Sequence, residues 1–237
     1  MKYCYSRINL MMGILLLLTV FASAQERKAG FKRIFDGKTM KNWDCDTTHW
    51  RIEKGIFVGE VSAEKPLKTN TFLIYKGKVP GNFEFMASYR ISPEGNSGVQ
   101  YRSEPVENVA YGLKGYQADI DGANRYTGQN YEERGRGFLA MRGQQATLQT
   151  GQKPVITGSV GDSDKLKEQI RNNDWNTIHI IARGNNMKHY INGVLMSETT
   201  DEDPTKRKLV GLIGLQVHVM PRMKVEYKDI FLKEIKK

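Results

Sequence analysis

The sequence predicts an all-β protein, built as a sandwich of two antiparallel sheets with one short helix. Residues 83–91 alternate between apolar and polar side chains, which is the pattern of a strand that buries one face. Several shorter segments share this pattern and are separated by Gly, Asn and Asp, and Asn192-Gly193 is a strong hairpin turn. A chain of 237 residues, 39% of them hydrophobic, can bury the core of one globular domain. No repeat or linker marks a second domain.

The expected strands follow one another along most of the chain. They are 31–35, 50–52, 56–58, 71–75, 83–91, 96–102, 115–121, 137–141, 175–182, 187–191, 194–196, 209–219 and 223–235. The one expected helix is 163–173, because Leu166 and Ile170 form a narrow apolar stripe there. Residues 124–136 show no clear period and are expected to form a long loop.

The N-terminus has the pattern of a targeting segment. Two basic residues precede the apolar run Leu10–Phe21, which is too short for a comfortable membrane span. Ala22-Ser23-Ala24 then fits a cleavage site. Residues 1–24 are therefore predicted to be a signal peptide and residues 25–237 a single sandwich domain. No cysteine stands directly after the cleavage site, so the mature protein is expected to be periplasmic or secreted, without a lipid anchor or a membrane span.

The charge distribution and the cysteine content argue against a nucleic-acid-binding protein and against a disulfide-stabilised one. The formal net charge is +10, but the lysines are spread along the chain and no basic helix gathers them. This distribution, together with export, argues against a nucleic-acid partner and favours a solvated basic surface. Removal of the signal peptide leaves Cys45 as the one cysteine, so the fold must be stable without an internal disulfide.

A polar face is the feature around which the expected site is organised. Residues 96–102 and 115–121 alternate polar and apolar side chains, and residues 215–218 do the same near the end of the chain. If the three strands share a sheet, their polar side chains meet on one face of it, over an apolar core. The members of this face are Gln100, Arg102, Gln117, Asp119, Asp121, Gln216 and His218.

The expected loop 124–136 can add aromatic and charged contacts beside this face, as long loops in compact domains often do. The candidate binding residues of the strands and the loop are Gln100, Gln117, Gln216, Tyr131, Glu132 and Arg134. The alternative is a surface loop that is held by its own ion pairs.

Several stretches, taken in their order and spacing, carry a family resemblance. They are F-D-G-K-T at 35–39, N-S-G-V-Q-Y-R at 96–102, G-Y-Q-A-D-I-D at 115–121, W-N-T-I-H-I at 175–180, G-N-N-M-K-H-Y-I-N-G at 184–193, G-L-I-G-L-Q-V-H at 211–218 and V-E-Y-K-D-I-F-L-K-E-I at 225–235. In these stretches the chain resembles the 3-keto-disaccharide hydrolase family, over residues 30–235. The resemblance implies a concanavalin A-like jelly-roll sandwich. It also implies action on glycosides whose sugar is oxidised to a ketone at C3.

The chemistry of such a substrate explains why the face would be polar. A ketone at C3 acidifies the C2 proton, a base removes this proton, the enolate expels the C1 oxygen substituent, and water then adds. The predicted function is therefore an exported enzyme that cleaves 3-keto-glycosides and 3-keto-disaccharides, with net hydrolysis. The candidate bases are Asp119 and Asp121, with His218 as the alternative.

The same reaction needs a group that stabilises the enolate oxygen and an acid for the leaving group. Arg102, Gln100 or a bound divalent cation are the candidates for the first role. His218, Glu132 or Tyr131 are the candidates for the second. No tight His or Cys spacing marks a metal site, and a cation held by oxygen ligands or by His218 with an aspartate stays open.

Two other interpretations compete with this one. A retaining glycosidase needs two carboxyl groups about 5 Å apart, and Gln117 stands where the first carboxylate of the glucanase pattern would be. Asp119 with Asp121 remains possible as such a pair. The second alternative is a carbohydrate-binding module that has the same sandwich fold but no catalytic activity. A purely structural surface protein is a further, weaker alternative.

Overall fold

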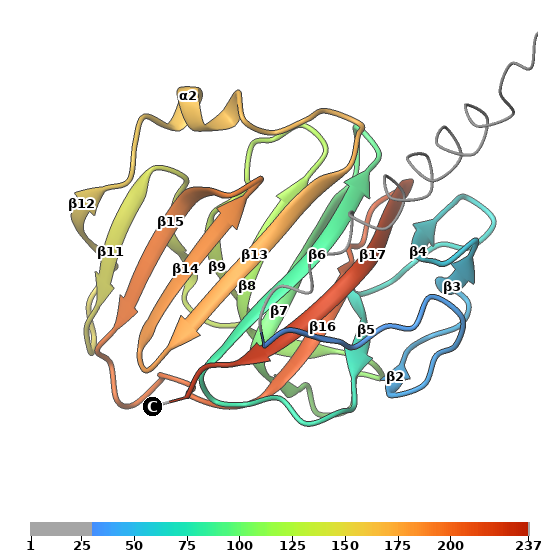
Figure 1. Ribbon diagram of the computed structural model, residues 1–237, viewed down its shortest axis with the longest axis horizontal. Helices are drawn as coiled ribbons and strands as arrows, with labels where there is room; N and C mark the ends of the chain where they lie inside the picture. Colours follow the sequence, from blue (N-terminus) through green and yellow to red (C-terminus); the bar gives the residue numbers. More distant parts are fainter. Residues whose placement is uncertain (1–29, 237) are drawn as a thin grey trace, which may run out of the picture. The chain divides into compact units, whose positions relative to one another are not determined.

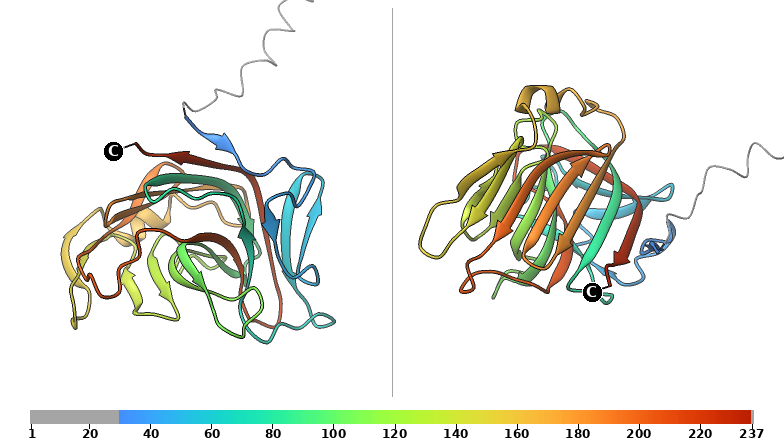
Figure 2. Two further views of the ribbon diagram at one scale, coloured as in Figure 1. Left: turned by 90° about the horizontal axis from the view of Figure 1, so that it is seen from below. Right: turned by 60° about the vertical axis from the view of Figure 1, so that its left-hand side comes forward.

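Two β-sheets that pack face to face make up most of the structure (Figures 1 and 2). This computed structural model describes residues 30–236. The strands are β1 (Lys32–Arg33), β2 (Trp43–Asp44), β3 (Trp50–Glu53), β4 (Ile56–Val61), β5 (Thr71–Tyr75), β6 (Phe83–Ile91), β7 (Asn96–Pro105), β8 (Leu113–Asp121), β9 (Asn130–Glu133), β10 (Gly137–Ala140), β11 (Gln144–Leu148), β12 (Val155–Ser159), β13 (Asn176–Arg183), β14 (Asn186–Ile191), β15 (Val194–Asp201), β16 (Leu212–Val217) and β17 (Met223–Glu234). The helix of the described residues is α2 (Ser163–Lys167).

The two sheets differ in size. The ten-stranded sheet has the order β12-β11-β15-β14-β13-β6-β17-β4-β3, with β1 added beside β17. The seven-stranded sheet has the order β10-β9-β8-β7-β16-β5-β2 and lies behind the first in Figure 1. The predicted all-β sandwich is therefore confirmed. The strand pairs of the described residues are antiparallel, except that β11 runs parallel to β15.

The hydrophobic core lies between the two sheets, as the alternation of the strands predicts. From the ten-stranded sheet, β6 and β13 direct Ala87, Tyr89 and Ile180 into it. From the seven-stranded sheet, β7 directs Val99 and Tyr101 into it. Each of these five residues is at most 1% exposed. Burial of one large apolar side chain contributes about 1.5–3 kcal/mol, so these layers hold the sandwich together.

Some elements differ from the expected ones. Helix α2 ends at Lys167 rather than at residue 173, because the following N–H groups, at Gln169 and Ile170, bond to carbonyls three residues back and tighten the chain into turns. Strand β9 lies inside the expected loop, and β11 and β12 form a hairpin that no clear alternation announced.

The predicted signal peptide, residues 1–24, lies outside the described residues, so export stays a prediction. From Lys32 onward the chain forms one compact unit. Within residues 30–236, no helix has both the length and the apolar character that a membrane crossing requires.

His189 on β14 joins the two sheets from inside the core. Its Nε2 lies 2.8 Å from the Tyr101 hydroxyl of β7, and its Nδ1 lies 3.1 Å from the carbonyl oxygen of Gln129. A neutral ring satisfies both contacts, since Nδ1–H donates to the carbonyl and Nε2 accepts from the hydroxyl. The ring is 1% exposed, and burial lowers the pKa of His189 to about 4, despite the opposing hydrogen bond to Gln129.

This buried histidine should make the fold acid-sensitive. An unfolded chain protonates His189 near pH 6.5, whereas the folded protein resists protonation until about pH 4. The stabilising share of neutral His189 is therefore complete above pH 6.5 and is lost as the pH falls toward 4, by about 2–3 kcal/mol. Urea denaturation of wild type and of the His189→Gln variant at pH 7 and pH 4.5 measures it. We expect a smaller loss in the variant, and an equal loss would contradict this role.

Candidate active site

Strands β7, β8 and β16 carry polar side chains on the outer face of the seven-stranded sheet, the face turned away from the core. Gln100 lies opposite Gln117, and Gly98 lies opposite Asp119, in the register of β7 with β8. Gln216 lies on β16, which pairs with the other side of β7. The structure thus brings together the three predicted glutamines and Asp119. We call Gln100, Gln117, Asp119 and Gln216 the polar face.

The Asp119 carboxylate is held between two amides. Its Oδ1 accepts a hydrogen bond from Gln117 Nε2 at 2.8 Å, and its Oδ2 accepts one from Gln129 Nε2 at 2.7 Å. Asp119 is 8% exposed, and no salt bridge within residues 30–236 involves it. Both carboxylate oxygens are therefore bound by neutral donors, and the negative charge has no cation beside it.

This environment changes the acidity of Asp119. Burial raises its pKa to about 7, the hydrogen bonds from Gln129 and Gln117 act in the opposite direction, and the charges of Asp121 and Glu133 add to the rise. A general base works best when its pKa lies near the working pH, because it is then both ionised and basic. Asp119 meets that condition near neutral pH.

The amides around Asp119 leave buried polar atoms without partners. Both polar atoms of the Gln100 side chain, Oε1 of Gln117 and Nε2 of Gln216 have no hydrogen-bond partner among the described residues. Gln117 Nε2 lies 3.4 Å from Gln216 Oε1, a long contact. Gly98 makes room for this arrangement, because a Cβ there would lie 2.6 Å from the Gln117 side chain. Buried polar groups normally find partners, so this cluster is prepared to bind a polar ligand.

A contact across the sheet closes one side of the polar face. The Asn70 side chain donates to Glu133 of β9 at 3.1 Å and accepts from the backbone N–H of Val219, just after β16, at 2.9 Å. These two partners lie on opposite flanks of β7 and β8. Gln100 and Gln216 are 0% exposed, which shows how completely the face is covered.

Asp121 has a different role from the expected one. Its carboxylate accepts hydrogen bonds from the backbone N–H groups of Arg125, Tyr126 and Thr127 at 2.8–3.0 Å, and from the Thr127 hydroxyl at 3.1 Å. These contacts fix the loop between β8 and β9. Asp121 thus differs from Asp119, whose carboxylate is held by two side-chain amides, because it is tied mainly to the backbone of this loop.

His218 stands one residue beyond the end of β16 and is partly exposed. Its Nδ1 lies 2.8 Å from the carbonyl oxygen of Val219. Alternation from Gln216 directs it toward the same side of the sheet. Within residues 30–236 no hydrogen bond or ion pair joins His218 to Asp119, so His218 lies at the rim of the polar face rather than within it.

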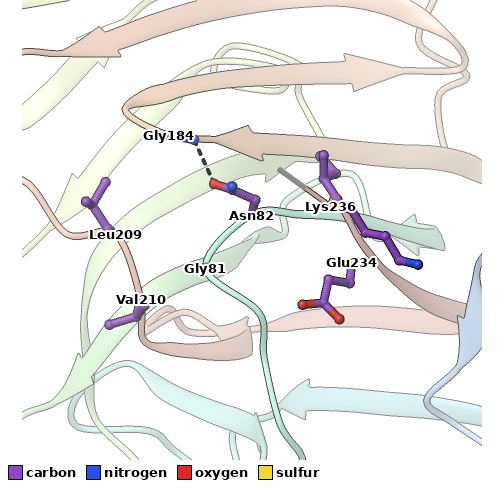
Figure 3. Close-up of a pocket in the computed structure, with 8 residues that line it drawn as sticks. Gly81, Asn82, Gly184, Leu209, Val210, Glu234 and Lys236 are labelled. Atoms are coloured by element: carbon purple, nitrogen blue, oxygen red, sulfur yellow. Dashed lines mark hydrogen bonds between the residues drawn. The ribbon is translucent and has the colours of Figure 1, made fainter.

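Arg102 does not join the polar face. Strand β7 has a bulge here, at which Arg102 adopts a φ of 49° and the alternation of side chains is broken. The buried guanidinium donates to the carbonyl oxygens of Gly81 at 2.8 Å and Lys208 at 3.5 Å, and burial lowers its pKa. Gly81 lines a pocket with Asn82, Leu209 and others (Figure 3), and Asp119 is not among the residues that line it. The structure therefore places Arg102 elsewhere than on the polar face where the sequence predicted it.

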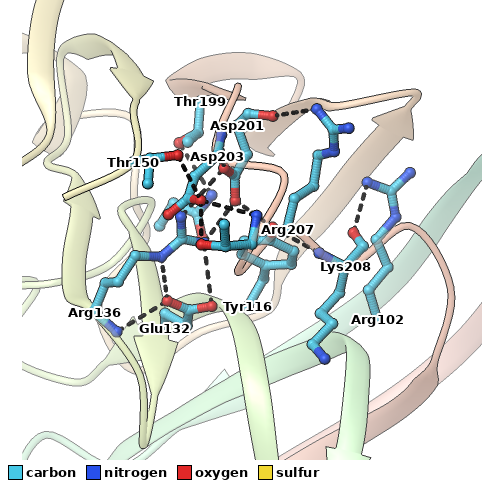
Figure 4. A network of polar contacts seen from close by, with 12 residues as sticks. Arg102, Tyr116, Glu132, Arg136, Thr150, Thr199, Asp201, Asp203, Arg207 and Lys208 are labelled. Atoms are coloured by element: carbon cyan, nitrogen blue, oxygen red, sulfur yellow. Dashed lines mark hydrogen bonds and ion pairs between the residues drawn. The ribbon is translucent and has the colours of Figure 1, made fainter. Parts of the chain in front are cut away.

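Glu132 points between the sheets instead of onto the polar face. It accepts a hydrogen bond from Arg136 Nε at 2.6 Å, and Arg136 also pairs with buried Asp201 of β15 at 2.6 Å (Figure 4). The Tyr116 hydroxyl donates to the same aspartate. The four side chains join the two sheets, so Glu132 does not lie beside the polar face, where the sequence predicted it.

Tyr131 lies opposite Gln117 in the register of β8 with β9, so it extends the polar face toward the sheet edge. Burial raises its pKa, and the charges of Glu133 and Asp119 raise it further, so the hydroxyl keeps its proton. Arg134 lies at the flank, where Nη2 donates to Thr69 Oγ1 at 3.0 Å.

Sequence reasoning missed Gln129, Glu133 and Asn70. Gln129 and Glu133 lie in a stretch where apolar residues do not alternate with polar ones, so no strand pattern was visible there. The pairing of β9 with β8 is what places Tyr131 and Glu133 on the outer face of the sheet. Asn70 reaches the face through contacts that are distant in sequence. No group of three His, Cys, Asp or Glu residues within the described chain could hold a metal ion, so the expected cation remains a matter for a chelator test.

Comparison with known proteins places this chain in a family. A family model described as a 3-keto-alpha-glucoside-1,2-lyase-like domain matches residues 30–233. The search of curated proteins gave no match.

Solved structures share the sandwich. Two crystal structures of candidate glycosyl hydrolases from Parabacteroides distasonis each have a TM-score of 0.56. They are 15% and 17% identical, and the matches cover 86% and 87% of this chain and 99% and 94% of theirs. The carbohydrate-binding module CBM66 of Bacillus subtilis has a TM-score of 0.52 at 14% identity, covering 81% of this chain and 96% of that one. At these identities the likeness shows the fold alone.

The unneutralised charge of Asp119 should cost stability. The unfolded chain ionises Asp119 near pH 4 and the folded protein only near pH 7, so wild type loses stability as the pH rises between these values. Asp119→Asn removes the charge and keeps the shape. We expect the variant to be more stable than wild type by about 2–4 kcal/mol at pH 8 and by much less at pH 4.5.

Urea denaturation at the two pH values measures this difference. Asp229→Asn is the matched control, because Asp229 lies in an exposed pair with Arg33 that contributes little. If Asp119→Asn is less stable than wild type at pH 8, the surrounding protein stabilises the negative charge of Asp119 more than its two amide contacts indicate.

Proposed function

The chain belongs to the family of 3-keto-alpha-glucoside-1,2-lyase-like domains, and from this premise we propose that it is an exported enzyme that cleaves the glycosidic bond of 3-keto-glycosides. The family and the sandwich fold indicate a carbohydrate-active protein. The observation that supports the finer proposal is Asp119, a buried carboxylate with a pKa of about 7 among neutral amides. The proposed reaction is elimination across C1 and C2, followed by hydration.

Asp119 is the proposed base. Its ionised oxygen removes the proton at C2, which the neighbouring C3 ketone acidifies, and the electron pair of the broken C–H bond forms the enolate. Gln117 and Gln129 hold the carboxylate at both oxygens, which fixes its direction. Because no Lys or Arg side chain of residues 30–236 forms an ion pair with it, the carboxylate keeps the basicity that this step requires.

The amides without partners are the proposed stabilisers of the enolate. Negative charge moves onto the C3 oxygen as the proton leaves, and fixed N–H donors in a buried site stabilise such charge strongly. Gln216 Nε2 and Gln100 Nε2 are such donors. They replace Arg102 in this role. The polar oxygens of the same residues can accept hydrogen bonds from sugar hydroxyls.

The leaving group needs a proton as the C1–O bond breaks. The enolate electrons then form the C1–C2 double bond and restore the C3 ketone, while the bond electrons go to the leaving oxygen. Tyr131 and His218 are the candidate donors that remain, since Glu132 is held between the sheets. Tyr131 lies nearer in register, opposite Gln117. Water then adds to the double bond at C1, and the sum is hydrolysis.

A carbohydrate-binding module is the second candidate, because Tyr126 and Phe138 are exposed aromatic residues near the polar face. Aromatic rings bind sugars in such modules without any reaction. The two functions differ in what they require of Asp119, which only the enzyme needs in its ionised form.

Release of a chromogenic leaving group from a 3-keto-glucoside tests the proposal, with the unoxidised glucoside as the control substrate. We expect cleavage of the keto substrate alone, and a loss of roughly 10²–10⁴-fold in kcat/KM for Asp119→Asn. Asp229→Asn should keep wild-type activity. A parallel reaction with a chelator shows whether a divalent cation takes part. If neither substrate is cleaved but sugar binding is still detected, the carbohydrate-binding module becomes the better interpretation.

The pH profile tests the role of Asp119 as a base. The carboxylate acts when ionised, so kcat/KM should rise with pH up to an apparent pKa near 7 and then level off. Tyr131→Phe and His218→Ala identify the acid, because loss of the acid should slow a poor leaving group such as methanol more than a good one such as nitrophenol. A profile that is flat from pH 5 to 8 would remove Asp119 as the base.

A further inference from the structure

The outer face of the seven-stranded sheet ends in exposed aromatic rings beside the polar face. Tyr126 is 37% exposed and Phe138 is 49% exposed, and Tyr131 lies between Phe138 and Gln117 of the polar face in the register of the strands. We propose that these three residues, which we call the aromatic platform, bind the leaving group of the substrate through a flat ring, either a second pyranose or an aryl group. This inference rests on the proposed function and adds its substrate class.

The rings are arranged as a connected surface. Tyr126 and Phe138 stack with centroids 6.1 Å apart at 27°, and Tyr131 meets Phe138 edge-on at 5.2 Å and 65°. Aromatic pairs of this geometry stabilise each other, so the surface is held in place before a ligand arrives. Exposed rings that are already fixed lose little conformational freedom when they bind a ligand.

The platform is rigidly tied to the strand that carries Asp119. Tyr131 lies opposite Gln117 of β8, and Phe138 lies opposite Tyr131 in the pairing of β9 with β10. Tyr126 stands in the loop that Asp121 fixes, through the hydrogen bond from its own backbone N–H at 2.8 Å. This gives the Asp121 carboxylate a purpose, since it holds one ring of the platform in place.

The distance from the base suits one additional ring. Adjacent strands lie about 4.8 Å apart, so the side chain of Phe138 on β10 is about 10 Å across the sheet from Gln117 on β8. A sugar whose C2 lies at Asp119 would extend its C1 substituent over about this span. In the opposite direction, β5 carries Phe72 and Ile74, which pack with Leu113 of β8, and all three are buried, so that side is closed. The open side is the platform.

The chemistry of the platform favours a ring over a charged or flexible group. Its exposed surface is aromatic carbon, and the C–H face of a pyranose or the face of an aryl ring packs on such carbon. Small leaving groups such as methanol would not reach it. Substrates with a ring on the C1 oxygen should therefore gain affinity that methyl glycosides do not.

The test compares methyl 3-keto-glucoside, phenyl 3-keto-glucoside and a 3-keto-disaccharide of the same anomeric configuration. For each substrate, the ratio of kcat/KM between wild type and Phe138→Ala is measured, which cancels intrinsic differences in leaving-group reactivity. We expect a loss of roughly 3- to 10-fold for the two ring-bearing substrates, mostly in KM, and less than about 2-fold for the methyl glycoside. Phe138→Tyr should restore the wild-type ratios. Ile156→Ala, which removes an exposed side chain on the other sheet, is the control.

Each outcome separates the two hypotheses. A loss for one ring-bearing substrate alone supports the platform and identifies that ring as its ligand. No loss for either, or an equal loss for the methyl glycoside, overturns the platform and leaves the proposed reaction intact. If wild type cleaves nothing, calorimetric binding of the same three compounds to Asp119→Asn, with and without Phe138→Ala, decides the platform independently. Weaker binding of phenyl but not methyl glycoside then supports it, and unchanged binding overturns it.

Discussion

The burial of β7 and β8 on both faces is the constraint on which the rest of the site depends. Their inner side chains, such as Val99 and Ala118, belong to the core between the sheets, while their outer ones, Gln100 and Asp119, are covered by loops. Polar side chains in such strands must find partners within the protein. Gln117 and Gln129 give Asp119 its partners, but the cluster keeps four polar atoms free. These four unpartnered buried atoms make the cluster a candidate site for a polar ligand.

The bulge at Arg102 protects the basicity of Asp119. Had β7 kept its alternation, the guanidinium would stand two residues from Gln100 on the same face, and a cation there would hold the pKa of the carboxyl low. The bulge directs it to the carbonyl oxygens of Gly81 and Lys208 instead. Asp119 is left among neutral amides, and burial then dominates its pKa. One local break in a strand therefore separates a structural arginine from a reactive carboxylate.

The sequence predicted the face where strands are regular and failed where they are not. Gln100, Gln117, Asp119 and Gln216 follow from period-two alternation, since each lies in a segment with apolar residues at the other positions. The alternation of polar and apolar residues does not reveal a bulge, so it predicted that Arg102 lies on the polar face. In β9 every residue is polar or aromatic, so no pattern could choose between Glu132 and its neighbour. The Asn70 contact joins segments about 60 and 150 residues away, and only the folded sheet brings them together.

The electrostatics of Asp119 bear on the choice between an enzyme and a binding module. A module needs hydrogen bonds and shape at this position, and an asparagine would supply both with no charge to bury. Burial opposes the charge of Asp119, and its neighbours offer only amides. Its ionised carboxylate therefore lowers the stability of the protein at neutral pH without improving the affinity for a neutral sugar. This loss of stability is explained if Asp119 must take up a proton during a reaction, since the environment that disfavours its charge also makes it a stronger base. In the proposed reaction the neutral amides around it would serve the second half of the same step, because the charge that leaves Asp119 moves to the C3 oxygen of the substrate, where N–H donors would stabilise it.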